Sequence, residues 1–205
     1  MARDSLRPRR ARAPNRRDAH EIVEAILVAA TDLASPEVTT NQIAARAGVG
    51  IASLYRYFPD RGAIFAELSR RLHRRFVVQM RAILAQPGLT VEEAVRAICK
   101  AAVSGPGVSR ELRRCLNLLV PPSWSAESAD ETYAETVLET ASWVSAKVAT
   151  PPADLAERMF AAISVVRGIV AMAMLYPQWA PPDERLIELA SAGVLAVLGD
   201  ELTSR

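Results

Sequence analysis

Residues 39–58 constrain the fold of this chain more than any other segment. They read as two short helices around a glycine turn, Thr-Thr-Asn-Gln-Ile-Ala-Ala-Arg-Ala-Gly-Val followed by Gly-Ile-Ala-Ser-Leu-Tyr-Arg-Tyr-Phe. Ile43 and Ala47 recur with helical spacing, and Gly48 permits the left-handed backbone of a tight turn. Leu54 can seal the angle between the two helices. The pattern predicts a helix-turn-helix, a unit that places its second helix in the major groove of DNA.

The same residues resemble a known family. Thr-Thr-x-x-Ile-Ala-x-x-Ala-Gly-Val, then Leu-Tyr-x-Tyr-Phe, Pro59 and the basic Arg61 are similar to the amino-terminal domain of TetR-type transcriptional repressors. The similarity runs from about residue 18 to 72, and the rest of the chain matches in length and helical character only. The resemblance implies an all-α fold of about nine helices. A three-helix DNA-binding domain would come first, and a helical ligand-binding and dimerisation domain would follow.

Charge and composition divide the chain into three parts. Residues 1–17 hold seven arginines and two prolines and almost nothing apolar, which predicts a disordered basic arm. This arm either enters the minor groove of DNA or remains a solvated tail. We expect the helix-turn-helix domain at 18–62 and the effector-binding and dimerisation domain at 63–205. Residues 1–75 carry 14 arginines and 8 acidic residues, net +6, whereas residues 76–205 carry 11 basic and 15 acidic residues, net −4. A basic N-terminal part on an acidic C-terminal part favours binding of a polyanion at the N-terminal part.

Caps and prolines mark off the helices. Asp18 is expected to cap the first helix, with Glu21 reaching back to it. The residue before a proline is pushed out of helical geometry, so Pro59 should end the second motif helix and Asp60 should cap a long linker helix. Later helices are expected over Thr90 to Val103, Ser109 to Leu119, between Pro121-Pro122 and Pro151-Pro152, and near Asp154 to Leu175 and Asp183 to Leu198.

The start of the second motif helix is the expected base reader. Gly50, Ile51, Ala52 and Ser53 are compact, so the backbone can come close to the base edges. Ser53 can hydrogen-bond an edge, and Ile51 or Ala52 can touch a thymine methyl group.

Phosphate contacts are expected around this start. Thr40 can offer its hydroxyl and its backbone amide to a phosphate at a helix start. The resemblance implies phosphate contacts for Tyr55, Tyr57 and Arg61, although either tyrosine ring could instead pack in the core. Asn41 and Arg56 are further candidates for DNA contact.

Two copies are expected, since one reader of this size buries too little surface for specificity and two readers can meet successive major grooves. The last two helices should pair with their symmetry mates in a four-helix bundle, or else form ordinary core within one chain. The expected interface residues are Ile163, Val166, Ile169 and Val170 on one helix and Leu186, Leu189, Ala190, Gly193 and Val197 on the other.

The middle helices could enclose a pocket for a small apolar effector, or they could form a filled core. Met80, Leu112, Leu116, Leu119, Trp143, Met159 and Phe160 are the candidates for its apolar wall, and Arg113, Asn117 and Tyr133 are the candidates for polar contacts. The linker helix would carry an effector-induced shift to the readers.

Other functions receive little support. Two histidines, two separated cysteines and the lack of a phosphate-cradling glycine loop argue against an enzyme, a cofactor site or a metal site. Cys99 and Cys115 are too isolated for a disulfide framework, which favours a reducing cytoplasm. The most membrane-like run, Met159 to Leu175, is interrupted by Arg167, so no membrane association is expected.

The prediction is therefore a cytoplasmic, ligand-responsive regulator. We expect a repressor that binds a palindromic double-stranded DNA operator as a homodimer and is released by a small apolar effector. Two alternatives remain open at this point: a helical protein-interaction module, and a DNA-binding regulator without a small-molecule effector.

Overall fold

The computed structural model describes residues 16–105, 107–120 and 122–203 of the chain. These residues form ten α-helices and no strand, so the all-α prediction is confirmed. The helices are α1 (Arg16–Asp32), α2 (Thr40–Ala47), α3 (Ile51–Tyr57), α4 (Arg61–Leu84), α5 (Val91–Ser104), α6 (Arg110–Leu119), α7 (Pro122–Ser145), α8 (Leu155–Leu175), α9 (Asp183–Leu198) and α10 (Asp200–Thr203).

The first three helices pack around a small apolar core. Ile26, Ile43 and Leu54, one from each helix, are fully buried there. Ile64 and Phe65 enter the same core from the first turn of α4. Burial of side chains of this size stabilises the unit by about 1.5–3 kcal/mol each, which explains how three short helices hold a fixed geometry.

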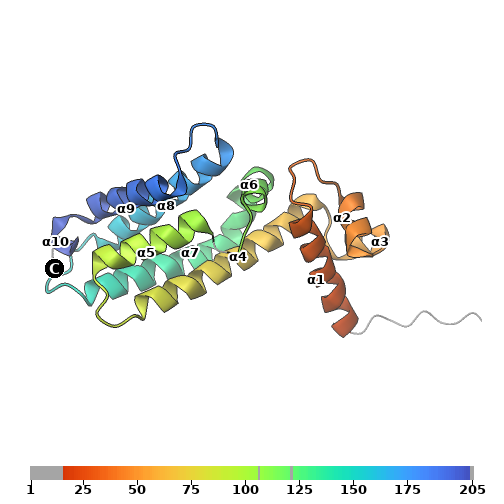
Figure 1. Cartoon of the computed structure of the whole chain (residues 1–205). Helices are drawn as coiled ribbons and strands as arrows, with labels where there is room; N and C mark the ends of the chain where they lie inside the picture. The colour runs from red at the N-terminus through yellow and green to blue at the C-terminus, as the bar shows by residue number, and fades with distance from the viewer. Residues whose placement is uncertain (1–15, 106, 121, 204–205) are drawn as a thin grey trace, which may run out of the picture.

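The linker helix α4 joins this unit to the rest of the molecule. Its start lies against α1, and its later turns lie along α5 and α7 (Figure 1). Asp60 caps it as expected, because its carboxylate accepts a hydrogen bond from the Ala63 amide at 2.8 Å. Helix α4 therefore connects the N-terminal helices to those of the body.

The C-terminal helices form a second core, in which α5, α8 and α9 pack together. Cys99, Met159 and Ala190 are buried at its centre. Both cysteines are free, as the sequence predicted. The capping boxes and caps predicted at Thr90 and Ser109 are present at the starts of α5 and α6.

Helix α6 contributes to the N-terminal core rather than to the C-terminal one. Leu112 and Cys115 are buried among the side chains of α1 to α4, and Leu116 packs against them. The helix also contacts α8. The N-terminal unit is therefore attached to the body in two places, through α4 and through α6.

Two details differ from the sequence-based expectation. Helix α1 extends from Arg16, so Asp18 lies within its first turn and is not its cap; arginine is a good helix former, which lets the helix begin earlier. A short helix, α10, follows Gly199 and brings the described count to ten rather than about nine. Residues 1–15, which hold most of the predicted basic arm, lie outside the described residues.

Candidate nucleic-acid interface

The turn between α2 and α3 has the geometry that its glycine predicted. Gly48 adopts φ 67° and ψ 27°, and the Val49 amide donates to the Ala44 carbonyl at 3.0 Å. A left-handed residue of this kind ends α2 abruptly, and α3 begins only three residues later, at Ile51. The turn thereby fixes how α3 projects from the molecule.

Helix α2 begins with a capping box. The Gln42 amide donates to Thr39 Oγ1 at 3.3 Å, and the Thr39 amide donates to Gln42 Oε1 at 2.9 Å. Thr40 is therefore the first helical residue, and its amide has no partner within the helix. The Thr-x-x-Gln signature was readable in the sequence but was not used there.

Two hydroxyl groups lie within hydrogen-bond distance of each other at the start of α2. Thr40 Oγ1 lies 3.0 Å from the Tyr55 hydroxyl, and Tyr55 is 51% exposed. The ring of Tyr55 is therefore not part of the core, which removes the alternative considered for it. Amide and hydroxyl donors at a helix start suit a phosphate oxygen.

The first turn of α3 presents a compact, uncharged surface. Gly50, Ile51 and Ala52 are exposed, with Ile51 at 37%. Ser53 is half-buried, and Arg56 Nη2 reaches its Oγ at 3.5 Å. Gly50 caps the helix with no side-chain hydrogen bond, so no capping side chain covers the amides of Ile51 and Ala52.

The other predicted DNA contacts are placed differently from one another. Arg56 and Asn41 are exposed, and the Arg56 guanidinium lies 5.5 Å from the Tyr57 ring centroid. Tyr57 is half-buried and packs against the N-terminal core. Arg61 Nη1 donates to the carbonyls of Pro36 and Val38 at 2.8 Å each, which ties the loop after α1 to the start of α4. Arg61 thus has a structural role that the sequence did not reveal.

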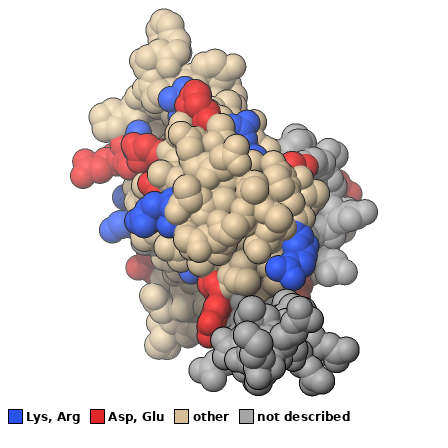
Figure 2. All heavy atoms as spheres, turned by 90° about the vertical axis from the view of Figure 1, so that its right-hand side faces the viewer, with Lys and Arg blue, Asp and Glu red and all other residues tan. Residues whose placement is uncertain are grey.

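Figure 2 views the end of the molecule that carries α2 and α3. The centre of this face is uncharged, and basic side chains lie on both sides of it, with acidic side chains among them. Such a surface suits a major groove with phosphates on its two edges.

Ion pairs that the sequence analysis missed join α1 to α2 and to α4. Arg46 Nη2 lies 2.5 Å from Asp32 Oδ2, joining α2 to the end of α1. Arg71 of α4 contacts Glu24 of α1, with Nη1 to Oε2 at 2.8 Å, and also contacts Glu67 at 2.9 Å. The hydrogen bond from Arg71 holds the pKa of Glu24 below its ordinary value of 4.5. Such pairings between segments far apart in sequence leave no local signal in the sequence.

The helix-turn-helix region matches a known protein family. Residues 26–68 match the model described as bacterial regulatory proteins, tetR family. Residues 26–68 therefore form a TetR-type DNA-binding domain. The matched residues run from the buried part of α1 to the second turn of α4, and so include the whole helix-turn-helix.

Solved structures agree with the TetR fold over most of the chain. A TetR-family transcriptional regulator from Streptomyces coelicolor is 20% identical, with a TM-score of 0.65, and the match covers 89% of this chain and 97% of that one. The fatty acid degradation regulator FadR from Bacillus halodurans is 16% identical, with a TM-score of 0.64 and coverage of 88% and 97%. SmeT, the repressor of the multidrug efflux pump SmeDEF of Stenotrophomonas maltophilia, is 18% identical, with a TM-score of 0.63 and coverage of 90% and 92%. The search of curated proteins found no match.

Among the described residues, the candidates for the effector pocket lie in different parts of the fold. Leu112 and Leu116, together with Leu119, belong to the N-terminal core, whereas Met159 belongs to the C-terminal core. Met80 is buried, and Phe160 is 56% exposed. A cavity between α1 and α6 is lined by one of these residues, Leu112. A second cavity, beside the start of α5, is lined by none of them.

The first of these cavities has a volume of about 480 Å³ and lies between the end of α1 and the start of α6. The polar candidates mostly serve their own fold. Arg113 donates to the carbonyls of Ala102 and Val103, and the Asn117 side chain donates to the Arg113 carbonyl.

The two aromatic candidates of α7 make specific contacts of their own. The Tyr133 hydroxyl lies 3.2 Å from Ser164 Oγ, and its ring meets the Phe160 ring edge-on at 5.8 Å. Trp143 Nε1 donates to the Leu84 carbonyl at 2.8 Å. An effector role for these residues stays a prediction.

The predicted dimer residues divide into two groups. Leu186 and Ala190 are buried inside the protomer and cannot form its outer surface. Leu189 is exposed, and the remaining six are half-buried: Ile163, Val166, Ile169, Val170, Gly193 and Val197. The sequence missed the strongly exposed apolar side chains of the same region, which are Phe160, Met172, Tyr176 and Trp179.

Helix α8 is the one helix in the described part of the chain that is long and apolar enough to cross a membrane, with a hydropathy of 1.7. Only 22% of its apolar window is buried within the protomer. Core helices of helical bundles reach the same length and composition, so this property alone is weak evidence for a membrane.

Proposed function

We propose that this chain is a cytoplasmic, non-enzymatic repressor of the TetR type. In this proposal it binds a palindromic operator as a homodimer, and a small apolar effector releases it from DNA. The observation that carries the proposal is the exposed, compact first turn of α3 beside the free Thr40 amide and the Thr40 and Tyr55 hydroxyl groups. Phosphate contacts there would orient the helix, and Gly50 to Ser53 would meet the base edges.

The homodimer is supported by the outer face of α8 and α9. Phe160 and Met172 of α8 are 56% and 55% exposed, and Leu189 of α9 lies exposed as well. An apolar helix with so little of its surface buried in one protomer favours burial against a second copy. Pairing α8 and α9 with their symmetry mates would give a four-helix bundle and hold two readers in fixed positions.

The effector response is supported by the two connections, α4 and α6, between the DNA-binding helices and the rest of the molecule. Helix α4 spans both cores, and α6 inserts Leu112 and Cys115 into the N-terminal core while it contacts α8. A ligand that shifted α4 or α6 would therefore reorient α3. A coupling free energy of about 1–3 kcal/mol would weaken DNA binding roughly 5- to 150-fold.

The first experiment is a mobility shift with genomic fragments that include the region upstream of the gene itself. Ala52→Glu places a negative charge on the exposed first turn of α3, so we expect it to abolish the shift without unfolding the chain. Ala82→Glu, at an exposed position on α4, is the matched control and should bind normally. Normal binding by Ala52→Glu would reject the proposed reader.

Candidate effectors are then titrated against the complex with the selected operator. Release of DNA at saturating ligand supports the regulatory part of the proposal. Saturable ligand binding that leaves DNA affinity unchanged would reject that part and leave DNA binding intact.

A further inference from the structure

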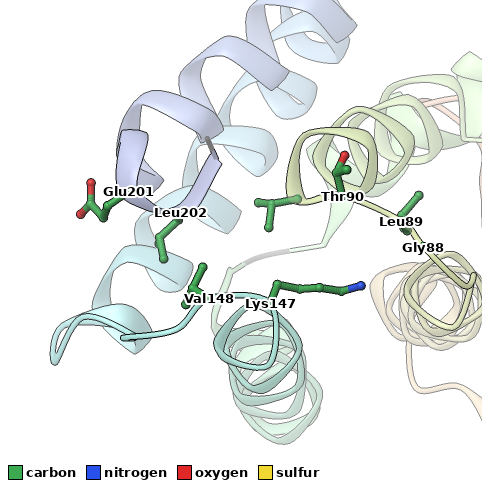
Figure 3. Close-up of a pocket in the computed structure, with 8 residues that line it drawn as sticks. Gly88, Leu89, Thr90, Lys147, Val148, Glu201 and Leu202 are labelled. Carbon is green, nitrogen blue, oxygen red and sulfur yellow. The ribbon is translucent and has the colours of Figure 1, made fainter. Parts of the chain in front are cut away.

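A cavity of about 220 Å³ lies at the end of the molecule remote from α3. Its walls come from the loop between α4 and α5, the segment that follows α7, and α10. Figure 3 shows residues of these three segments arranged around one space. The volume corresponds to about seven water molecules at roughly 30 Å³ each, and so to a ligand of about six to nine heavy atoms.

The lining of this cavity is apolar on several sides. Leu89 and Val91 come from the start of α5 and the loop before it, whereas Val148 and Leu202 come from the opposite walls. Val91 and Leu202 are buried. A hydrocarbon group of a ligand would therefore replace water next to apolar side chains, which is favourable by about 25 cal/mol per Å² of apolar surface.

Lys147 supplies the only cationic side chain among the lining residues. Its ammonium has no carboxylate partner among the described residues and lies 4.9 Å from the ring centroid of Trp143. Glu201 also borders the cavity, but its carboxylate points away in Figure 3, and its Oε1 binds Arg158 Nη1 at 2.5 Å. The charge left to meet a ligand is thus positive.

The Thr90 hydroxyl on the opposite wall is already used. Thr90 Oγ1 donates to Glu93 Oε2 at 3.0 Å in the capping box of α5. The cavity consequently offers one cationic side chain beside apolar side chains, in a lining that is partly polar. This combination favours an anionic head on a short hydrocarbon body, because only an anion adds the attraction of opposite charges to the hydrogen bond from the ammonium.

We infer that this cavity binds a small amphiphilic carboxylate, with its carboxylate on Lys147 and its hydrocarbon part against Leu89, Val91, Val148 and Leu202. The site lies apart from α3, and apart from the residues predicted to line an effector pocket, although Lys147 contacts one of them, Trp143.

The position of the cavity gives its occupant an effect on the linker helix. Trp143 Nε1 donates to the carbonyl of Leu84, the last residue of α4. A carboxylate that draws the Lys147 ammonium away from the Trp143 ring acts next to this anchor. Control of DNA binding from this site would rest on the proposed function, whereas binding of the carboxylate itself does not.

The test is an equilibrium titration of the full chain by calorimetry, with hexanoate as the probe and hexanol as the uncharged analogue. We expect saturable binding of hexanoate and at least about tenfold weaker binding of hexanol, since hexanol can accept a hydrogen bond from Lys147 but cannot form an ion pair with it. Hexanoate should also change tryptophan fluorescence, and Trp143→Phe should remove that change.

Variants locate the site. Lys147→Met should weaken hexanoate binding about tenfold or more, whereas Lys147→Arg should retain most of it. Lys100→Met is the matched control, because Lys100 is exposed on α5, does not line the cavity, and should leave binding unchanged. Circular dichroism melts check that the exposed Lys147 position tolerates both changes.

Three results would overturn the inference: no saturable binding of hexanoate, equal binding of hexanol, or undiminished binding by Lys147→Met. None of these would affect the proposed DNA-binding function. Conversely, failure of the mobility shift would leave this ligand site standing.

Discussion

At the scale of single residues, the reader depends on a few side chains with unusual surroundings. Gly48 is held at positive φ, and a Cβ placed on it would meet nothing within 4 Å. The glycine is thus needed for its backbone and not for space. Tyr55 is exposed beside Thr40 and contributes a hydroxyl group to the surface.

Gly48→Ala should lower the free energy of unfolding by about 1–2 kcal/mol, the cost of a left-handed conformation for a residue with a Cβ. Denaturant unfolding measures this. Gly48→Asn should cost clearly less, because asparagine tolerates this conformation. Equal costs for the two variants would contradict the backbone explanation.

Tyr55→Phe should leave the unfolding free energy nearly unchanged, since the hydroxyl lies at the surface. It should weaken operator binding about fivefold, the effect of losing a hydrogen bond of roughly 1 kcal/mol. Fluorescence anisotropy with a labelled operator measures the affinity. Unaltered binding would show that Tyr55 does not contact DNA.

The local sequence predicted the roles of some of these residues but not of others. The turn at Gly48 was predictable because only the local backbone decides it, and the Thr39 capping box could have been predicted from its spacing. The engagement of Arg61 was not predictable: its carbonyl partners, Pro36 and Val38, are brought to it only by the packing of α1 on α4.

At the scale of elements, ion pairs between helices orient the reader on the linker helix. Arg71 of α4 contacts Glu24 of α1, and the pKa of Glu24 is lowered chiefly by the hydrogen bond from Arg71. The folded state then binds its proton more weakly than the unfolded state. Its contribution to stability is complete above a pH of about 4.5 and is lost as the pH falls through the lower, folded-state pKa.

Glu24→Gln should therefore lower the unfolding free energy at neutral pH, by less than about 1 kcal/mol because both side chains are partly exposed. The difference between the wild type and this variant should shrink below the ordinary pKa of 4.5. Thermal melts across the acidic range test this. In an Arg71→Met background Glu24→Gln should have little pH-dependent effect, and an undiminished effect there would argue against the pair.

Helix positions were the most predictable feature at this scale. Apolar periodicity and capping residues indicated α4, α5, α6, α8 and α9 with ends close to those observed. The start of α1 and the presence of α10 were not predicted. Helix ends without a distinctive cap leave little trace in the sequence, and a four-residue helix has too few positions for a period.

At the scale of the whole molecule, the proposed operator binding depends on assembly of two chains through α8 and α9. The sequence identified these helices by their apolar composition but not the side chains that face outward. Leu186 and Ala190 turned out to be buried, while Met172 and Phe160 are exposed. Which face of an apolar helix is covered depends on its neighbours in space, and the same limit explains the effector-pocket residues that fall into separate cores.

Met172→Glu should shift the homodimer toward monomer, with a dissociation constant at least about tenfold higher, because a charge would enter an apolar interface. Sedimentation velocity over a range of concentrations measures the shift. Val78→Glu is a matched control at an exposed apolar position on α4 and should assemble normally. Equal assembly of both variants would reject the α8–α9 interface.

In the proposed complex, two copies of α3 bind successive major grooves on one face of an operator. Insertion of five base pairs between the half-sites of a selected operator turns one half-site by about half a helical turn. The account predicts that affinity then falls to that of a single half-site. Affinity unchanged by the insertion would contradict it.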